Sequence, residues 1–425
     1  MPQQTAQERL HARLKNFTGS KTFKYLLFFL IVPVLIAYLV WEIYWYSRVN
    51  LLCVKWHTHL AFPVYLFLIG NLIIRAIGKR TVPSAIPGLI TAYSSLIFTL
   101  FIVEVMLMVS DKYKTNLEKQ LGYYYSQYQT LQNKRYHIWT TTPHFIEKKE
   151  FVYWRPTNNE GLADSNWTTT STPGTKRIMA IGDSFTEGDG APFDSTYPVF
   201  LKQNLLKLGD SIYMMNAGVC GSDPFYNYIH LKEKLLLYKP DIIIQTLSSS
   251  DIENDFMTRG GLERFNGPSV SYRTPPIAEP LYAISYVSRI FYHAAGYNEL
   301  FLKPDAIDKM RPEIDSSFTA LFNEYSNLCR QKGIKLVVVL RPDINEIVDN
   351  AYSYDLTTIL TGLKADKDIT VIDLLGRYKN YIQATNTRPG NYYWQLDKHH
   401  NAKGYQMLAT VLTPDIHALL IDTIP

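Results

Sequence analysis

The chain is poor in cysteine and carries no strong charge of one sign. Its 425 residues include only three cysteines, Cys53, Cys220 and Cys329, and their spacing fits neither a disulfide framework nor a metal site. The formal net charge is only +5, and much of the positive excess lies around apolar stretches near the N-terminus. A disulfide-stabilised domain, a cysteine metal centre and a nucleic-acid partner are therefore not expected.

Long apolar runs are present, and they predict a membrane anchor of about three helices. The first run, Tyr25–Trp45, is long enough to span a bilayer, and no small-residue cleavage site of a signal peptide follows it. The second, about Leu60–Ile77, is shorter and contains Arg75. The third, Ala85–Val109, carries Glu104 near its far end, where an interfacial position is expected.

Basic residues around these runs predict their orientation. Five precede the first run, two lie in the first loop, and three, Arg75, Lys79 and Arg80, lie at the end of the second run and in the second loop. Because cytoplasmic loops are enriched in Lys and Arg, everything after Val109 is expected outside the cytoplasm. If the second run only lies in the membrane interface, the large domain would instead be cytoplasmic. In either case the lipid bilayer is an expected partner.

The rest of the chain predicts a tyrosine-rich stalk and linker over 110–175 and an α/β domain over 176–425. The segment 1–24 is expected in the cytoplasm and 25–109 in the membrane. Alternating apolar and amphipathic runs predict a parallel sheet of about five strands covered on both faces. The alternation stops over 259–312, which is expected to be an insertion that forms a lid or substrate wall, packs on the domain, or touches the membrane. The predicted strands are Ile178–Ile181, Ile212–Met215, Ile242–Leu247, Ile334–Leu340 and Thr370–Ile372, and the helices are Tyr197–Leu208, Tyr226–Leu237, Ser316–Gln331, Asn345–Leu363 and Gln406–Ile421.

A serine follows the first predicted strand directly. Ile178–Ile181 ends in Gly182-Asp183-Ser184, and a predicted helix follows with Asp194 as its candidate cap. This arrangement exposes a hydroxyl at the carboxyl end of a sheet, where α/β folds keep their sites. The alternative is an ordinary strand-to-helix turn in which Ser184 only caps the helix.

An acid and two histidines lie close together near the other end of the chain. Asp397, His399, His400, Asn401 and Gly404 share one loop, which a final amphipathic run follows. A carboxylate and an imidazole on one loop suit a general base and the group that orients it, as a serine nucleophile requires.

With both stretches in view, about the last 250 residues resemble the SGNH (GDSL-type) hydrolases. The resemblance implies a three-layer flavodoxin-like α/β fold, with Ser184 as nucleophile and Asp397 as the acid. Some members have one residue between acid and histidine, which selects His399 as the base, and others have two, which selects His400. The position of Asn401, two residues after the first histidine, favours His399.

The resemblance also implies an oxyanion site. The stretch Asn216–Gly221 resembles the block whose glycine offers a backbone N–H, which places that role on Gly221, although a tight loop after a strand would use the same residues. The N–H of Ser184 would be a second donor. Where the family has a donating asparagine this chain has Ser250, and Asn254 is the alternative donor from a rebuilt loop.

These features together predict a membrane-anchored serine esterase that works through an acyl-enzyme, without a metal or organic cofactor. The expected substrate is an O-acyl, specifically O-acetyl, group on an envelope polysaccharide, which is removed or transferred. A membrane O-acyltransferase is an expected partner in the case of transfer. The alternatives are an esterase for lipids or small esters, and a non-catalytic binding or assembly protein that has the same fold.

Overall fold

The structure is a computed structural model that describes residues 56–113, 144–266, 269–270, 279–297 and 305–421. The chain forms two compact units. The smaller comprises residues 1–115 and 276–296, and the larger comprises 116–275 and 297–425. The predicted first span, Tyr25–Trp45, and residues 114–143 of the predicted stalk and linker lie outside the described residues.

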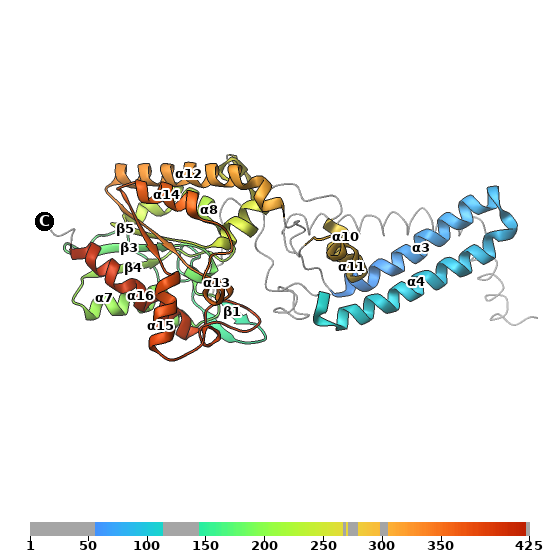
Figure 1. Cartoon of the computed structure of the whole chain (residues 1–425), viewed down its shortest axis with the longest axis horizontal. Coiled ribbons are helices and arrows are strands. Elements are labelled where there is room, and N and C mark those ends of the chain that lie inside the picture. The colour runs from blue at the N-terminus through green and yellow to red at the C-terminus, as the bar shows by residue number, and fades with distance from the viewer. Residues whose placement is uncertain (1–55, 114–143, 267–268, 271–278, 298–304, 422–425) are drawn as a thin grey trace, which may run out of the picture. The chain divides into compact units, whose positions relative to one another are not determined.

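A five-stranded parallel sheet forms the centre of the larger unit (Figure 1). Its strand order, β4-β3-β5-β8-β9, is 2-1-3-4-5 when the strands are renumbered along the chain, which is the flavodoxin-like order. The strands are apolar on both faces because helices cover both. The predicted sheet is thus confirmed, with strands β3 (Lys176–Ile181), β4 (Ile212–Asn216), β5 (Ile242–Leu247), β8 (Lys335–Leu340) and β9 (Ile369–Asp373).

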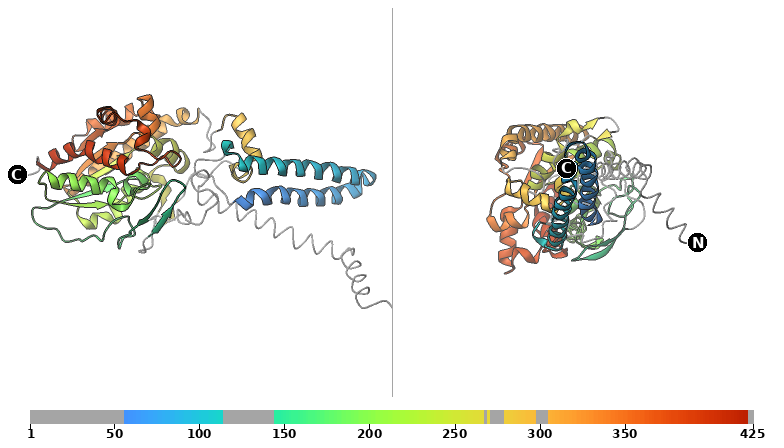
Figure 2. Two further views of the ribbon diagram at one scale, coloured as in Figure 1. Left: turned by 90° about the horizontal axis from the view of Figure 1, so that it is seen from below. Right: turned by 90° about the vertical axis from the view of Figure 1, so that its right-hand side faces the viewer.

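Helices cover the two faces of this sheet in separate layers, which are seen from two further sides in Figure 2. One layer, with α8, α12 and α14, buries the apolar core of one face, and the other, with α7, α13, α15 and α16, buries that of the opposite face. The helices are α7 (Tyr197–Lys207), α8 (Pro224–Glu233), α12 (Ala306–Lys332), α13 (Ile344–Asp349), α14 (Thr357–Ala365), α15 (Leu375–Ala384) and α16 (Ala402–Ile421).

Two predictions about the helices are wrong. The predicted helix Asn345–Leu363 is two helices, because the backbone of Asn350 adopts a left-handed conformation with φ 56° and ends α13 there. Asp194 does not cap α7. It lies in a preceding 3₁₀ turn and accepts a hydrogen bond from the neighbouring serine, whereas Thr196 occupies the N-cap position.

Part of the predicted stalk and linker is also a packed element of the larger unit. The strands β1 (His144–Glu147) and β2 (Val152–Arg155) form an antiparallel hairpin. Along β2 the side chains alternate, so that Tyr153 and Arg155 are buried while Trp154 is exposed. The segment 144–155 is therefore not a linker, and its buried face reaches the site described below.

The smaller unit contains two long apolar helices, α3 (Trp56–Thr81) and α4 (Ile86–Val109), joined by a short 3₁₀ turn. By length and composition, His59–Ile77 and Pro83–Val109 could each cross a membrane. They coincide with the second and third apolar runs of the sequence.

Two helices from the predicted insertion pack with α3 and α4 in the same unit. They are α10 (Glu279–Ile284) and α11 (Tyr286–Ala294), whereas other parts of 259–312 belong to the larger unit. Glu104 of α4, which is 1% exposed, accepts hydrogen bonds from the hydroxyl of Ser285 at 3.0 Å and from the next two backbone N–H groups at 2.6 and 3.0 Å. Its carboxylate thus satisfies the first two backbone donors of α11.

Replacing Glu104 by Leu should release α11 from α4. Each buried donor left without an acceptor costs about 1–3 kcal/mol, and this substitution affects three. Hydrogen exchange of the amides in 285–289 should become faster in the full-length protein, while Met106→Leu, on the exposed side of the same helix, should leave it unchanged. Unaltered protection in Glu104→Leu would show that the carboxylate does not hold the segment.

Candidate active site

The serine lies in a sharp turn at the carboxyl end of β3. A Cβ on Gly182 would come within 2.0 Å of the Thr246 hydroxyl, so only glycine fits where the strand ends. The short helix α6 (Ser184–Glu187) follows, and the carboxylate of Asp183 caps it by accepting the N–H of Phe185 at 2.9 Å. Capping is therefore done by Asp183, and the serine hydroxyl is left for another contact.

That contact is with His399. Ser184 Oγ lies 2.6 Å from His399 Nε2, and His399 Nδ1 lies 2.5 Å from Asp397 Oδ1. The acid and the histidine come from the loop before α16, whose first turn is capped by Asn401 as it accepts the N–H groups of Lys403 and Gly404 at 3.0 and 3.1 Å. The order of the strands brings this loop to the edge of the sheet where β3 ends, at the switch point of the topology.

Charges around the pair favour ionised Asp397 and raise the basicity of His399. Burial opposes both charged forms, but the aspartate charges of Asp397 and Asp189 outweigh it and hold the pKa of His399 above its ordinary value of 6.5. Burial likewise raises the pKa of Asp397, yet His399 and Lys148 together bring that pKa below its usual 3.8. The imidazole is thus suited to accept a proton from the serine.

His400 has a different environment. It is fully buried, its Nε2 lies 3.2 Å from the hydroxyl of Tyr378, and its Nδ1 lies 3.1 Å from the carbonyl oxygen of Tyr392. Burial lowers its pKa well below 6.5, so it stays neutral. The structure thus brings His399 to Ser184, whereas His400 packs in the core behind the loop.

The glycine-containing loop after β4 runs along α6. A Cβ on Gly218 would lie 2.1 Å from the backbone nitrogen of Glu187, so the loop could not pass this close with any other residue. Gly221 has φ 71°, in the left-handed region that favours glycine. Both glycines therefore have a steric reason to be present, independent of any role toward an oxyanion.

Ser250 and Asn254 follow β5. Ser250 Oγ lies 2.7 Å from the hydroxyl of Ser248, which also donates to Asp251 at 3.0 Å. The Ser250 hydroxyl is therefore part of a local network at the end of the strand. Asn254 belongs to a π-helical turn, Asp251–Phe256, and its side chain lies outside the described part of the structure.

The sequence reasoning missed two side chains of the hairpin turn. Lys148 Nζ donates to Asp397 Oδ2 and to Asp189 Oδ2, both at 2.8 Å. Glu150 accepts the backbone N–H groups of residues 395–397 at 2.9, 2.8 and 2.7 Å. The alternating pattern of β2 was a signal for a strand, but nothing local in the sequence connects this turn with Asp397.

The thiol of Cys220 lies near the site but is held in its protonated form. Burial, together with the charges of Glu187 and Asp189, raises the pKa of the Cys220 thiol well above 9, so the thiol is not a nucleophile at neutral pH. No cluster of three or more His, Cys, Asp or Glu side chains suited to a metal occurs in the part of the chain that the structure describes.

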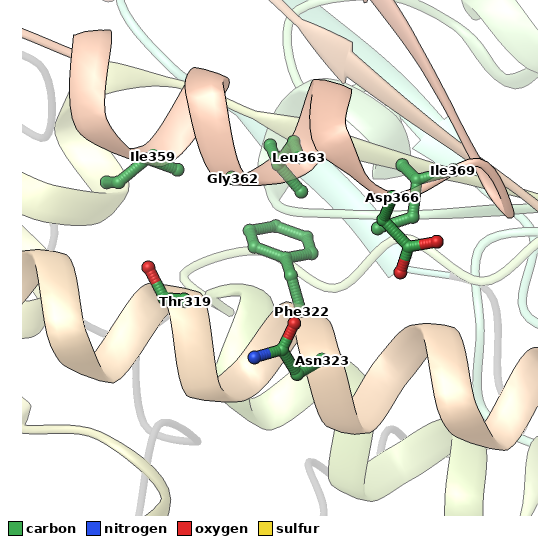
Figure 3. Close-up of a pocket in the computed structure, with 8 residues that line it drawn as sticks. All are labelled: Thr319, Phe322, Asn323, Ile359, Gly362, Leu363, Asp366 and Ile369. Atoms are coloured by element: carbon green, nitrogen blue, oxygen red, sulfur yellow. The ribbon is translucent and has the colours of Figure 1, made fainter.

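A hollow lies between α12 and α14, and none of Ser184, His399 and Asp397 lines it (Figure 3). Its lining is largely apolar, with Phe322 and Leu363 facing each other across it and Asp366 at one end. No nucleophile and base meet there, so it is not a candidate for the reaction.

No family model and no curated protein matches the chain. Similar solved structures include a two-domain esterase active on acetylated mannans, at 12% identity and a TM-score of 0.36, covering 59% of this chain and 51% of that one. This chain thus spans about half the length of that esterase. Others are a lipase/acylhydrolase from Enterococcus faecalis (14%, TM-score 0.35, 57% and 96% covered) and a family 3 carbohydrate esterase from Clostridium thermocellum (15%, 0.33, 58% and 98%). At these identities and scores no activity is transferred to this chain.

The two adjacent histidines should differ in their effect on stability. His400→Ala leaves a cavity among buried rings and removes two polar contacts, and should lower the midpoint of thermal unfolding by roughly 4 °C or more. His399→Ala should lower it much less, because the His399 side chain is partly exposed. Thermal unfolding of the purified protein in detergent measures both, and equal midpoints would contradict the assignment of His400 to the core.

Proposed function

We propose that the protein is a serine hydrolase acting on ester bonds, with Ser184 as nucleophile, His399 as general base and Asp397 as the group that orients it. The observation that carries this proposal is the continuous contact from Ser184 Oγ through the imidazole to the Asp397 carboxylate. Nucleophile and base within hydrogen-bond reach, with the base held by a third group, is the geometry that acyl transfer requires.

In the proposed reaction His399 Nε2 takes the proton of Ser184 as Oγ attacks the ester carbonyl carbon. The resulting tetrahedral intermediate collapses when the alcohol leaves, taking the proton from His399, and an acyl-serine remains. Water, or the hydroxyl of an acceptor in the case of transfer, is then deprotonated by His399 and attacks this acyl group. Release of the acid or of the new ester regenerates Ser184.

Donors for the oxyanion are proposed from three segments. As the first residue of α6, Ser184 has no intrahelical acceptor for its own N–H. The N–H of Gly221 is the proposed second donor. The hydroxyl of Ser250, at the end of β5, is the third where the resemblance implies an asparagine, and Asn254 is the alternative. One such donor contributes about 2.7–4 kcal/mol in a serine protease.

The proposed substrate is an O-acyl group, specifically O-acetyl, on an envelope polysaccharide. This rests on the resemblance of the sequence together with the predicted extracytoplasmic location, and removal and transfer use the same acyl-enzyme. A membrane O-acyltransferase would be the partner in transfer, and a lipid or small ester is the alternative substrate. A purely non-catalytic role is less well supported, since it gives no reason for an assembled triad.

Variants of the triad test the enzyme directly. A fluorophosphonate probe should label Ser184, and Ser184→Ala should abolish both labelling and hydrolysis of a short-chain aryl ester. His399→Ala should reduce hydrolysis by a factor on the order of 10³ or more. Ser211→Ala, at the opposite end of the sheet, serves as control and should have no effect. Unchanged hydrolysis in Ser184→Ala would remove the proposed mechanism.

The predicted multi-pass topology has its own test. The basic residues of the N-terminal segment and of the second loop favour a domain outside the cytoplasm. A reporter active only outside the cytoplasm, fused after Tyr113, should therefore be active. Activity of a cytoplasm-only reporter at the same position would contradict this orientation and, with it, the envelope substrate.

A further inference from the structure

The turn of the β1–β2 hairpin holds the acid of the triad by both its side chain and its backbone. The side chain of Lys148 is only 5% exposed, and its ammonium group bridges the carboxylates of Asp397 and Asp189. Two residues further along the chain, the carboxylate of Glu150 accepts the N–H of Asp397 at 2.7 Å. Two oppositely charged side chains of one turn therefore hold one residue, Lys148 at its carboxylate and Glu150 at its backbone N–H.

The geometry of this contact divides the two oxygens of Asp397 between two partners. Oδ1 faces His399 Nδ1 at 2.5 Å, and Oδ2 faces Lys148 Nζ at 2.8 Å. A carboxylate held at both oxygens cannot rotate away from the imidazole. On the other side, Asp189 is itself held by Arg155, at 3.3 Å, and by the hydroxyl of Tyr153, at 3.0 Å, both from β2.

We infer that Lys148 is a positioning residue of the proposed acyl-transfer reaction, which holds the Asp397 carboxylate against His399 and balances the second buried aspartate beside it. This inference rests on the proposed function. Glu150 supports the same loop through its backbone. The hairpin thus helps to position the site, although in the chain it precedes the first strand of the five-stranded sheet.

The charges that face His399 determine how the site responds to pH. Removal of the Lys148 cation leaves the two carboxylates less compensated, which stabilises the imidazolium and should raise the pKa of His399. Removal of the Asp189 charge should lower that pKa. The groups that face the imidazole are Asp397 from its own loop, Asp189 from the segment after α6, Lys148 from the hairpin, and the uncharged Ser184 and Phe185 of α6.

Because the base must be neutral to accept a proton, kcat/KM should rise with pH through the pKa of His399. In Lys148→Met the acidic limb of this profile should move to higher pH, and each unit of displacement lowers kcat/KM below the limb about tenfold. In Asp189→Asn it should move to lower pH. The double variant should return the limb toward the wild-type position, since it removes one charge of each sign.

Matched controls come from the same turn. Lys149 is exposed and lies next to Lys148, so Lys149→Met should leave the profile unchanged, and Glu147→Gln is the corresponding control for Glu150→Gln. The measurement is kcat/KM for a short-chain aryl ester across pH with the full-length protein, alongside thermal unfolding of each variant. Glu150→Gln should lower kcat with little change in KM.

The outcomes separate the inference from the function on which it rests. Opposite displacements in Lys148→Met and Asp189→Asn support the positioning role. A limb that stays in place in both variants, or a loss that is equal at every pH and follows a lowered unfolding midpoint, would overturn it while leaving the esterase intact. A wild-type chain that neither hydrolyses the ester nor reacts with a fluorophosphonate would remove the proposed function and this inference together.

Discussion

A buried carboxylate has to be compensated, and the larger unit is arranged around that requirement at Asp397. This residue is 4% exposed, and an isolated charge at such a depth would take up a proton instead of staying ionised. The fold supplies an imidazole at one oxygen, an ammonium group at the other and a charged acceptor for the backbone N–H. These partners come from the hairpin and from the loop before α16, so the two ends of the unit meet at one residue.

The parallel sheet explains why such distant segments can meet. In the strand order 2-1-3-4-5, the connections that follow the neighbouring strands β3 and β5 lead to helices on opposite faces, and the crevice between them collects the loops that follow the strands. Ser184 enters this crevice from α6, and the loop of His399 enters it from the far end of the chain. Gly182 leaves room for the side chains of Thr246 and Thr186, and Gly218 lets its loop approach the backbone of α6.

The strands, and the segments that carry Ser184, Asp397 and His399, could be predicted from the sequence because each has a local signal. Apolar runs marked the five strands to within a residue or two, and the Gly-Asp-Ser turn and the Asp-x-His loop each carried their own pattern. The choice between His399 and His400 came from spacing alone, and the structure places only His399 beside the serine. By contrast, the contact of Lys148 with Asp397 joins residues 249 positions apart, and no local pattern specifies it. The end of α13 depended on one left-handed asparagine, whose φ the helical periodicity does not reveal.

The hairpin also determines where the larger unit can be cut at its N-terminal side without losing contacts of the site. Judged by its five-stranded sheet, the domain starts at Lys176, and a truncation made there would retain every strand of that sheet together with Ser184, Asp397 and His399. It would nevertheless lack Lys148, Glu150 and Arg155, and so leave Asp189 and Asp397 together in a buried site without their cations. The smallest segment that keeps these contacts and the whole hairpin therefore begins no later than residue 144. A recombination event with its boundary at the first strand of the sheet would transfer the sheet without the cations that pair with Asp189 and Asp397.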